Sequence, residues 1–211
     1  MSSAPRSAKR QKKASKPLYS ADEFRLGLEK TTELRSLNLS PTPSLAATLI
    51  FAQYECGTAI CVSPHGDILT CAHCLDEDAP AVGIFKLLLF SSGLLVLASS
   101  VKVDVVADVA LLRILGVLDE HGTLDSSPRY DYPHVSLASQ SPILGAALTC
   151  YGQPGRDDLE SEKSRKTSYD CLCLSTGFYR GCAKGDVMDN SEIGSCSIRV
   201  GLTGGTAARR F

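Results

Sequence analysis

A histidine and an aspartate, each placed at the end of a β-like segment, are the residues of this chain best suited to chemistry. His73 follows two short apolar segments that are joined by Pro64-His-Gly-Asp67, a sequence typical of the turn between two strands. Asp108 opens a later apolar segment, Asp108-Val-Ala-Leu-Leu112. An imidazole that is oriented by a carboxylate can take a proton from a hydroxyl or thiol nucleophile. The pair therefore predicts nucleophilic catalysis, provided that the fold brings the two strand ends together.

The elements that must position this pair are short strands. Val101, Val103 and Val105 alternate with Lys102 and Asp104, which is the period of a half-buried strand. Other apolar segments of similar length are separated by turns, and no long helical period interrupts them, so the pattern favours an antiparallel barrel or sandwich. The remaining expected strands cover residues 45–51, 57–63, 68–70, 84–97 (as two strands), 109–115, 135–137, 146–151 and 171–176.

The N-terminal part of the chain has a different composition. Residues 1–19 are basic and rich in small residues, and we expect a disordered arm there. Ser20-Ala-Asp-Glu23 has the spacing of a helix capping box, and Ser40-Pro-Thr-Pro43 is typical of a linker, so residues 20–44 are predicted to be a short helix and a linker. Residues 45–193 then form the β domain, and residues 194–211 a tail of unfamiliar composition.

The two motifs, in this order, resemble those of the trypsin-like serine peptidases, and of their Deg-type branch in particular. Gly57-Thr-Ala-Ile leads into Asp67-Ile-Leu-Thr70 and His73, and Asp108-Val-Ala-Leu follows. Leu144–Gly155 is similar to the family segment in which a strand ends at a Gly/Pro turn. Leu174-Ser-Thr-Gly177 stands where the strand before the nucleophile begins. The resemblance covers residues 46–193.

The resemblance implies an all-β fold, a trypsin-like double β-barrel, and serine endopeptidase activity on peptide or protein substrates. It implies that His73 acts as general base and then general acid, that Asp108 orients it, and that no cofactor or metal is needed. His65, His121 and His134 are expected to face solvent. Because a two-barrel unit normally takes roughly 200–250 residues, residues 45–193 are expected to leave the second barrel incomplete.

The third member of the catalytic group is missing from this chain. The family's nucleophile stands in a Gly-x-Ser-Gly-x-Pro turn, whose amides bind the oxyanion, and no segment has that form. The nearest serine, Ser195 in Gly194-Ser-Cys196, lacks the following glycine and proline. Cys196 lacks the same turn and is a remote alternative. We therefore expect the chain, with no nucleophile, to be inactive.

Codon arithmetic offers a reason for the missing motif. Reading Leu202–Phe211 two bases later permits Tyr-Trp-Gly-His-Ser-Gly-Ala-Pro-Leu, which contains the family's nucleophile motif. The serine codon would straddle Thr206 and Ala207. Our hypothesis is that the tail is a frameshifted reading of a truncated trypsin-like peptidase. The coding nucleotide sequence refutes it if the shifted frame holds a stop, or no serine codon, at that point.

Two alternatives to a peptidase stay open. One is a non-catalytic pseudopeptidase whose groove binds peptides by strand addition. The other is a zinc-stabilised nuclear protein, in which the cysteines around His73 hold a structural ion and the basic arm contacts nucleic acid. The cysteines that such a site would use are Cys56, Cys61, Cys71 and Cys74.

Composition limits the partners of the protein. The formal net charge of −1 favours neither nucleic acid nor an anionic membrane, so we expect no nucleic-acid partner beyond weak contact by the basic arm. No apolar run approaches the roughly 20 residues that span a bilayer. Nine cysteines is an odd number, and no secretory signal precedes them, so we expect free thiols and an intracellular location, cytoplasm or nucleus.

Overall fold

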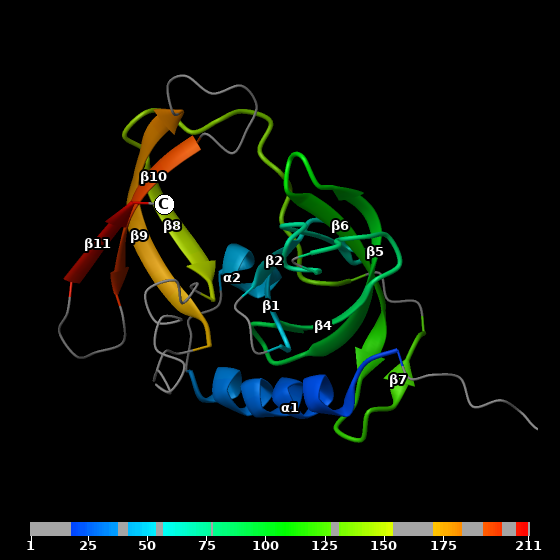
Figure 1. The fold of residues 1–211 in the computed structure, drawn as a ribbon. Coiled ribbons are helices and arrows are strands. Elements are labelled where there is room, and N and C mark those ends of the chain that lie inside the picture. The colour runs from blue at the N-terminus through cyan, green and yellow to red at the C-terminus, as the bar shows by residue number, and fades with distance from the viewer. Residues whose placement is uncertain are drawn as a thin grey trace, which may run out of the picture.

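The computed structural model describes eight segments of the chain (Figure 1). They are residues 18–37, 42–53, 57–76, 78–127, 131–153, 171–182, 192–199 and 206–210. Most of the predicted basic arm, Cys56 and the charged segment 156–166 lie outside the described residues.

The N-terminal strands form a closed barrel, seen on the right of Figure 1. They pair antiparallel in the order β3-β2-β1-β4-β5-β6-β7, and β3 also pairs with β6, which closes the first six strands on themselves. The strands are β1 (Thr48–Phe51), β2 (Thr58–Cys61), β3 (Asp67–Thr70), β4 (Phe85–Phe90), β5 (Leu95–Asp104), β6 (Val109–Leu118) and the short β7 (Leu124–Asp125).

The C-terminal strands form a second, antiparallel sheet that stays open among the described residues. Its order is β11-β10-β9-β8, so β8 and β11 are its edges. The strands are β8 (Ala147–Gly152), β9 (Cys173–Cys182), β10 (Glu192–Arg199) and β11 (Thr206–Arg210). The predicted all-β fold, with one complete barrel and one incomplete one, is confirmed. The segment from residue 194 onward supplies most of β10 and all of β11.

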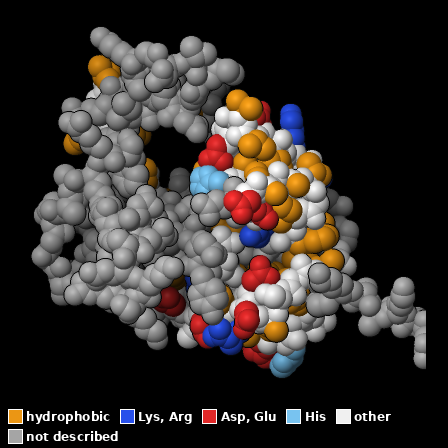
Figure 2. All heavy atoms as spheres, viewed as in Figure 1, with side chains coloured by type: hydrophobic (Ala, Val, Ile, Leu, Met, Phe, Trp, Pro, Cys, Tyr) orange, Lys and Arg blue, Asp and Glu red, His pale blue; other side chains and the backbone are white. Residues whose placement is uncertain are grey.

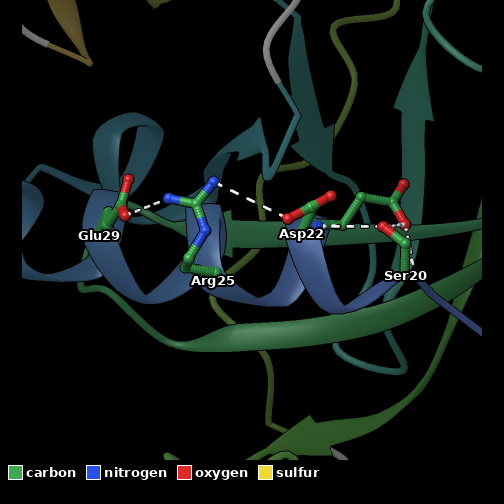
Figure 3. A network of polar contacts seen from close by, with 5 residues as sticks. Ser20, Asp22, Arg25 and Glu29 are labelled. Atoms are coloured by element: carbon green, nitrogen blue, oxygen red, sulfur yellow. Dashed lines mark hydrogen bonds and ion pairs between the residues drawn. The ribbon is translucent and has the colours of Figure 1, made fainter.

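The predicted N-terminal helix is present as α1 (Ala21–Ser36). Its capping box is confirmed, because the Ser20 hydroxyl accepts a hydrogen bond from the Glu23 amide at 3.1 Å and the Glu23 carboxylate accepts one from the Ser20 amide at 2.8 Å. Arg25 lies between two acidic side chains on the exposed face, 3.9 Å from Asp22 and 2.5 Å from Glu29 (Figure 3). Pairs of opposite charge three or four residues apart stabilise a helix.

Two details of the predicted elements were wrong. The strand expected over residues 45–51 begins only at Thr48, because Pro43–Ala47 forms a short helix, α2. The Thr42 hydroxyl accepts from the Leu45 amide, and Pro43 occupies the first turn, where no amide donor is needed. Residues 135–137 are not a strand. The Val135 amide there donates to the Cys61 carbonyl at 3.0 Å, which attaches the segment to β2.

The second part of strand β4, Leu87–Phe90, is buried on both faces, which explains its run of four apolar residues. Leu88 and Phe90 belong to the core inside the barrel, whereas Leu87 and Leu89 belong to a second core outside it. The barrel core is built mainly from Leu49, Phe51, Ile68, Leu88, Phe90, Val96 and Leu112. The outer core contains Leu34 of α1, Ile50, Leu87, Leu89, Leu97, Cys171 and Leu172.

Helix α1 connects the barrel to the second sheet. The Lys30 ammonium donates to the carbonyls of Phe51 at 2.7 Å and Gln53 at 2.8 Å. The Glu33 carboxylate accepts from the Cys171 amide at 2.6 Å, at the entry to β9. Burial, and then the nearby Glu33 charge, raise the pKa of the Cys171 thiol to about 12. This cysteine is therefore a neutral, buried thiol at the joint between the two sheets.

The described surface mixes all kinds of side chain. Figure 2 shows acidic, basic and hydrophobic groups interspersed over the face in view. No helix in the described part of the chain is long and apolar enough to cross a membrane.

Candidate active site

The β2–β3 hairpin carries His73, and its turn is held by side-chain hydrogen bonds. The Ser63 hydroxyl donates to the Asp67 carboxylate at 2.7 Å and accepts from the Asp67 amide at 3.1 Å. Arg113 on β6 donates from Nε to the same carboxylate at 2.7 Å. Burial alone would raise the pKa of Asp67, but the bonds from Ser63 and Arg113 hold it below its ordinary value. The turn is thus fixed both within the hairpin and to β6.

Gly66 is required by this turn, and replacing it should destabilise the protein. Its φ is +84°, and a Cβ there would lie 2.9 Å from the Ile114 Cβ. We expect Gly66→Ala to lower the free energy of unfolding by about 2–4 kcal/mol, the sum of a left-handed backbone and a clash in a packed site. Urea unfolding measures it. Gly83→Ala is the matched control. Gly83 has a φ of +88°, but a Cβ at that position would have no atom beyond its chain neighbours within 4 Å. An equal loss in both variants would contradict the clash.

The pairing of β3 with β6 brings the two candidate residues together. Thr70, the last residue of β3, pairs with Ala110 near the start of β6. His73 comes shortly after the end of one strand and Asp108 just before the beginning of the other. Because the strands are antiparallel, these two ends lie at the same side of the barrel. The sequence prediction that the two strand ends meet is confirmed.

Asp108 contacts His73 in two ways. Its Oδ2 lies 2.7 Å from Nδ1 of the imidazole, and its Oδ1 accepts a hydrogen bond from the His73 amide at 3.0 Å. The Ala72 amide also donates to the Asp108 carbonyl, at 3.3 Å. Backbone and side chain of Asp108 therefore both hold the turn that carries the imidazole.

The backbone of Asp108 adopts an unusual conformation. Its φ is +49°, and it is the only residue other than glycine with a positive φ among the described residues. Aspartate and asparagine tolerate this left-handed region better than other side chains do. Just before it, the Asp104 carboxylate accepts from the amides of Val106 at 3.1 Å and Ala107 at 2.9 Å, which shapes the β5–β6 turn.

The charge of Asp108 determines which imidazole nitrogen carries a proton. Burial would raise the pKa of Asp108, but the hydrogen bonds and charge of His73 bring it below its ordinary value. An ionised carboxylate only accepts hydrogen bonds, so Nδ1 must donate and the neutral ring then accepts at Nε2. The His73 side chain is 61% exposed and that of Asp108 is 34% exposed. The accepting nitrogen thus belongs to a ring that solvent and substrate can reach.

The nearest nucleophile candidates do not stand in a turn. Ser195 and Cys196 both lie inside β10, which pairs with β9 on one side and with β11 on the other. Cys196, for example, pairs with Gly177 and Arg209. A backbone engaged in two ladders has no spare amides for an oxyanion. The other predicted residues, His65, His121 and His134, are exposed, as expected.

Cys71 and Cys74, two of the four cysteines of the structural zinc alternative, lie in the same turn as His73, whereas Cys56 lies outside the described residues. Cys61 is fully buried in the barrel core, and its Sγ donates to the Ser63 carbonyl at 3.3 Å. Cys71 does lie near His73, but its third neighbour is Asp108: donor atoms of all three lie within 4.8 Å of one another. Sequence spacing placed Cys71 near His73 correctly, but it did not include Asp108 in the group.

The model of the trypsin-like peptidase domain matches residues 57–208, a segment that includes His73 and Asp108 and reaches into β11. Among solved structures, the chain is similar to the serine endoprotease from Yersinia pestis, with 14% sequence identity and a TM-score of 0.45. The match covers 83% of this chain and 53% of the other, so this chain spans about half of that enzyme's length. No curated protein matches the sequence.

Proposed function

The chain belongs to the family of trypsin-like serine peptidases, and we propose that His73 and Asp108 are the general base and orienting acid of its peptide-hydrolysing chemistry. In that chemistry a serine hydroxyl attacks the peptide carbonyl while an imidazole takes its proton. The imidazole then gives the proton to the leaving amine. The substrates would be peptides or proteins.

The observation that carries this proposal is the contact of 2.7 Å between Nδ1 of His73 and Oδ2 of Asp108. It fixes the tautomer in which Nε2 accepts a proton, and it places a negative charge beside the imidazolium that would result. The hydrogen bond from the His73 amide to Oδ1 restrains the same carboxylate from the backbone side. A base, its orienter and their mutual geometry are thus assembled before any substrate binds.

We also propose that this 211-residue chain does not hydrolyse peptides. The sequence contains no Gly-x-Ser-Gly-x-Pro segment, and Ser195 and Cys196 lie in a strand paired on both sides. Without a nucleophile no acyl-enzyme can form. The His73–Asp108 pair is then an intact half of a catalytic site.

A second candidate, a peptide-binding pseudopeptidase, is supported by the edge position of β8. Among the described residues β8 pairs with β9 alone, so its other edge can accept a peptide strand. A peptide that adds to this edge should slow amide hydrogen exchange in Ala147–Gly152. This candidate needs neither His73 nor Asp108, and binding that survives Asp108→Asn would favour it.

Replacing Asp108 by Asn tests the proposed pair directly. Asparagine tolerates the φ of +49°, so the variant should fold while losing the charge. We expect the low-field proton signal of the His73 Nδ1–H in the NMR spectrum to disappear in Asp108→Asn. In the unchanged chain, the pKa of Asp108 is lowered. The signal should therefore persist as the pH falls through about 4, the ordinary aspartate value, and weaken only as the pH passes the folded pKa.

The matched control is Asp119→Asn. Asp119 also accepts two backbone amides, from His121 at 2.9 Å and Thr123 at 2.8 Å, in a turn with an exposed histidine nearby. This variant should leave the His73 signal unchanged. If Asp108→Asn also left it unchanged, the carboxylate would not orient His73 and the proposed function would fail.

A further inference from the structure

Three side chains of types that can bind metals lie close together just beyond the end of β3. Donor atoms of Cys71, His73 and Asp108 all lie within 4.8 Å of one another. The proposed peptidase chemistry uses the last two and leaves the thiol without a role. Cys71 is one of the exposed free cysteines, and the His73 ring beside it is exposed as well. A ligand from solvent can therefore reach all three groups.

The backbone of this turn holds the three groups at nearly fixed positions. The amides of Ala72 and His73 donate to Asp108, at 3.3 Å and 3.0 Å. Within the turn, the Cys74 amide donates to the Cys71 carbonyl at 3.3 Å and the Leu75 amide to the Ala72 carbonyl at 3.0 Å. Tetrahedral zinc with bonds of about 2.0–2.3 Å needs donors about 3.3–3.8 Å apart. The donor atoms of Cys71, His73 and Asp108, all within 4.8 Å of one another, are already close to that spacing.

The local charge favours a cation. Asp108 adds a carboxylate to the exposed thiol of Cys71 and the exposed imidazole of His73. A divalent cation is attracted by a carboxylate, and it deprotonates a thiol that coordinates it.

The set of donors selects the kind of metal. One thiolate, one imidazole and one carboxylate suit Zn²⁺, which takes sulfur, nitrogen and oxygen ligands. Mg²⁺ and Ca²⁺ prefer oxygen ligands and do not bind thiolates well. Three protein ligands leave a fourth tetrahedral position for water, which is typical of an accessible site rather than of a closed structural one.

We propose that Cys71, His73 and Asp108 bind one Zn²⁺ ion reversibly. Coordination through Nδ1 of His73 would replace its contact with Asp108, and coordination through Nε2 would occupy the nitrogen that accepts a proton in the neutral ring. Zinc binding does not rest on the proposed function.

Equilibrium dialysis of the reduced, chelator-treated chain against Zn²⁺ tests the site. We expect one bound ion per chain. Loss of an outer-shell partner alone costs about 10–100-fold in affinity. Loss of a ligand in Cys71→Ser or His73→Ala should therefore weaken binding by at least about 100-fold. With Co²⁺ in place of Zn²⁺, the unchanged chain should show a thiolate-to-cobalt absorption band that Cys71→Ser lacks.

Another cysteine provides the control. Cys150→Ser removes an exposed thiol on β8 that does not belong to the donor cluster. This variant should bind Zn²⁺ as the unchanged chain does. The proposal is overturned if no stoichiometric ion binds, or if Cys71→Ser keeps the affinity. Zinc binding together with an unaltered His73 signal in Asp108→Asn would instead refute the proposed function and leave the metal site standing.

Discussion

Incubation of the purified 211-residue chain with a fluorophosphonate probe is expected to give no covalent adduct. The probe reacts with a serine whose hydroxyl is deprotonated by a neighbouring imidazole and whose product oxyanion is stabilised by backbone amides. Here the imidazole is positioned by Asp108, but the sequence contains no Gly-x-Ser-Gly-x-Pro segment, and Ser195 lies in a strand that is paired on both sides. Even a complete scaffold that has lost its catalytic residues accelerates hydrolysis by at most roughly 10³–10⁴-fold over the reaction in water. Intact-mass spectrometry over hours should show the unmodified mass alone, while trypsin in the same tube is labelled fully.

Two variants identify the nucleophile if an adduct does form. Labelling that disappears in Ser195→Ala, but persists in Cys196→Ser, would show that Ser195 reaches His73 and that β10 rearranges in solution. Any stoichiometric adduct that also requires His73 would contradict the inactivity that we propose. An adduct that survives His73→Ala would be a non-specific side reaction, and it would leave the proposal intact.

The contact between His73 and Asp108 was predictable because local sequence patterns encode it. The turn Pro64-His-Gly-Asp67 defines a hairpin, and the apolar run after Asp108 defines a strand of the same barrel. Antiparallel closure leaves few ways to place the end of one strand away from the start of the other. The His73–Asp108 contact therefore follows from the order of motifs, before any coordinates are known.

Features that depend on non-local packing could not be predicted. The helix at Pro43–Ala47 replaces the start of an expected strand, because capping by Thr42 outweighs a preference that is only statistical. The segment at Val135 forms no strand, and its amide donates a backbone hydrogen bond to the Cys61 carbonyl.

The two cores explain why the barrel, rather than the second sheet, determines the site. The pairing of β3 with β6 brings His73 and Asp108 close together. Ile68 on β3 and Leu112 on β6 are fully buried in the barrel core. The second sheet attaches through β4 and α1 in the outer core. A truncation in the barrel core should therefore lower the free energy of unfolding and also disturb the His73–Asp108 contact.

Phe90→Ala is expected to be the most destabilising single truncation in the barrel. Phe90 is fully buried on β4, and its ring stacks on that of Tyr132 with centroids 6.1 Å apart. Removing a buried phenylalanine costs roughly 3–5 kcal/mol, because apolar burial is lost and the surrounding cavity relaxes only partly. Total stabilities are about 5–15 kcal/mol, so we expect the variant to unfold at a much lower urea concentration than the unchanged chain. Urea unfolding followed by circular dichroism measures the loss.

Phe85→Ala is the matched control, on the same strand and with the same change of side chain. Phe85 is 37% exposed at the start of β4, outside the barrel core, so its truncation should cost about 1 kcal/mol or less. The difference between the two variants isolates the contribution of the barrel interior from that of a phenylalanine in a strand. If the two losses were equal, Phe90 would not be a main support of the barrel. In that case the His73–Asp108 contact should also survive Phe90→Ala, which the NMR signal of the imidazole would show.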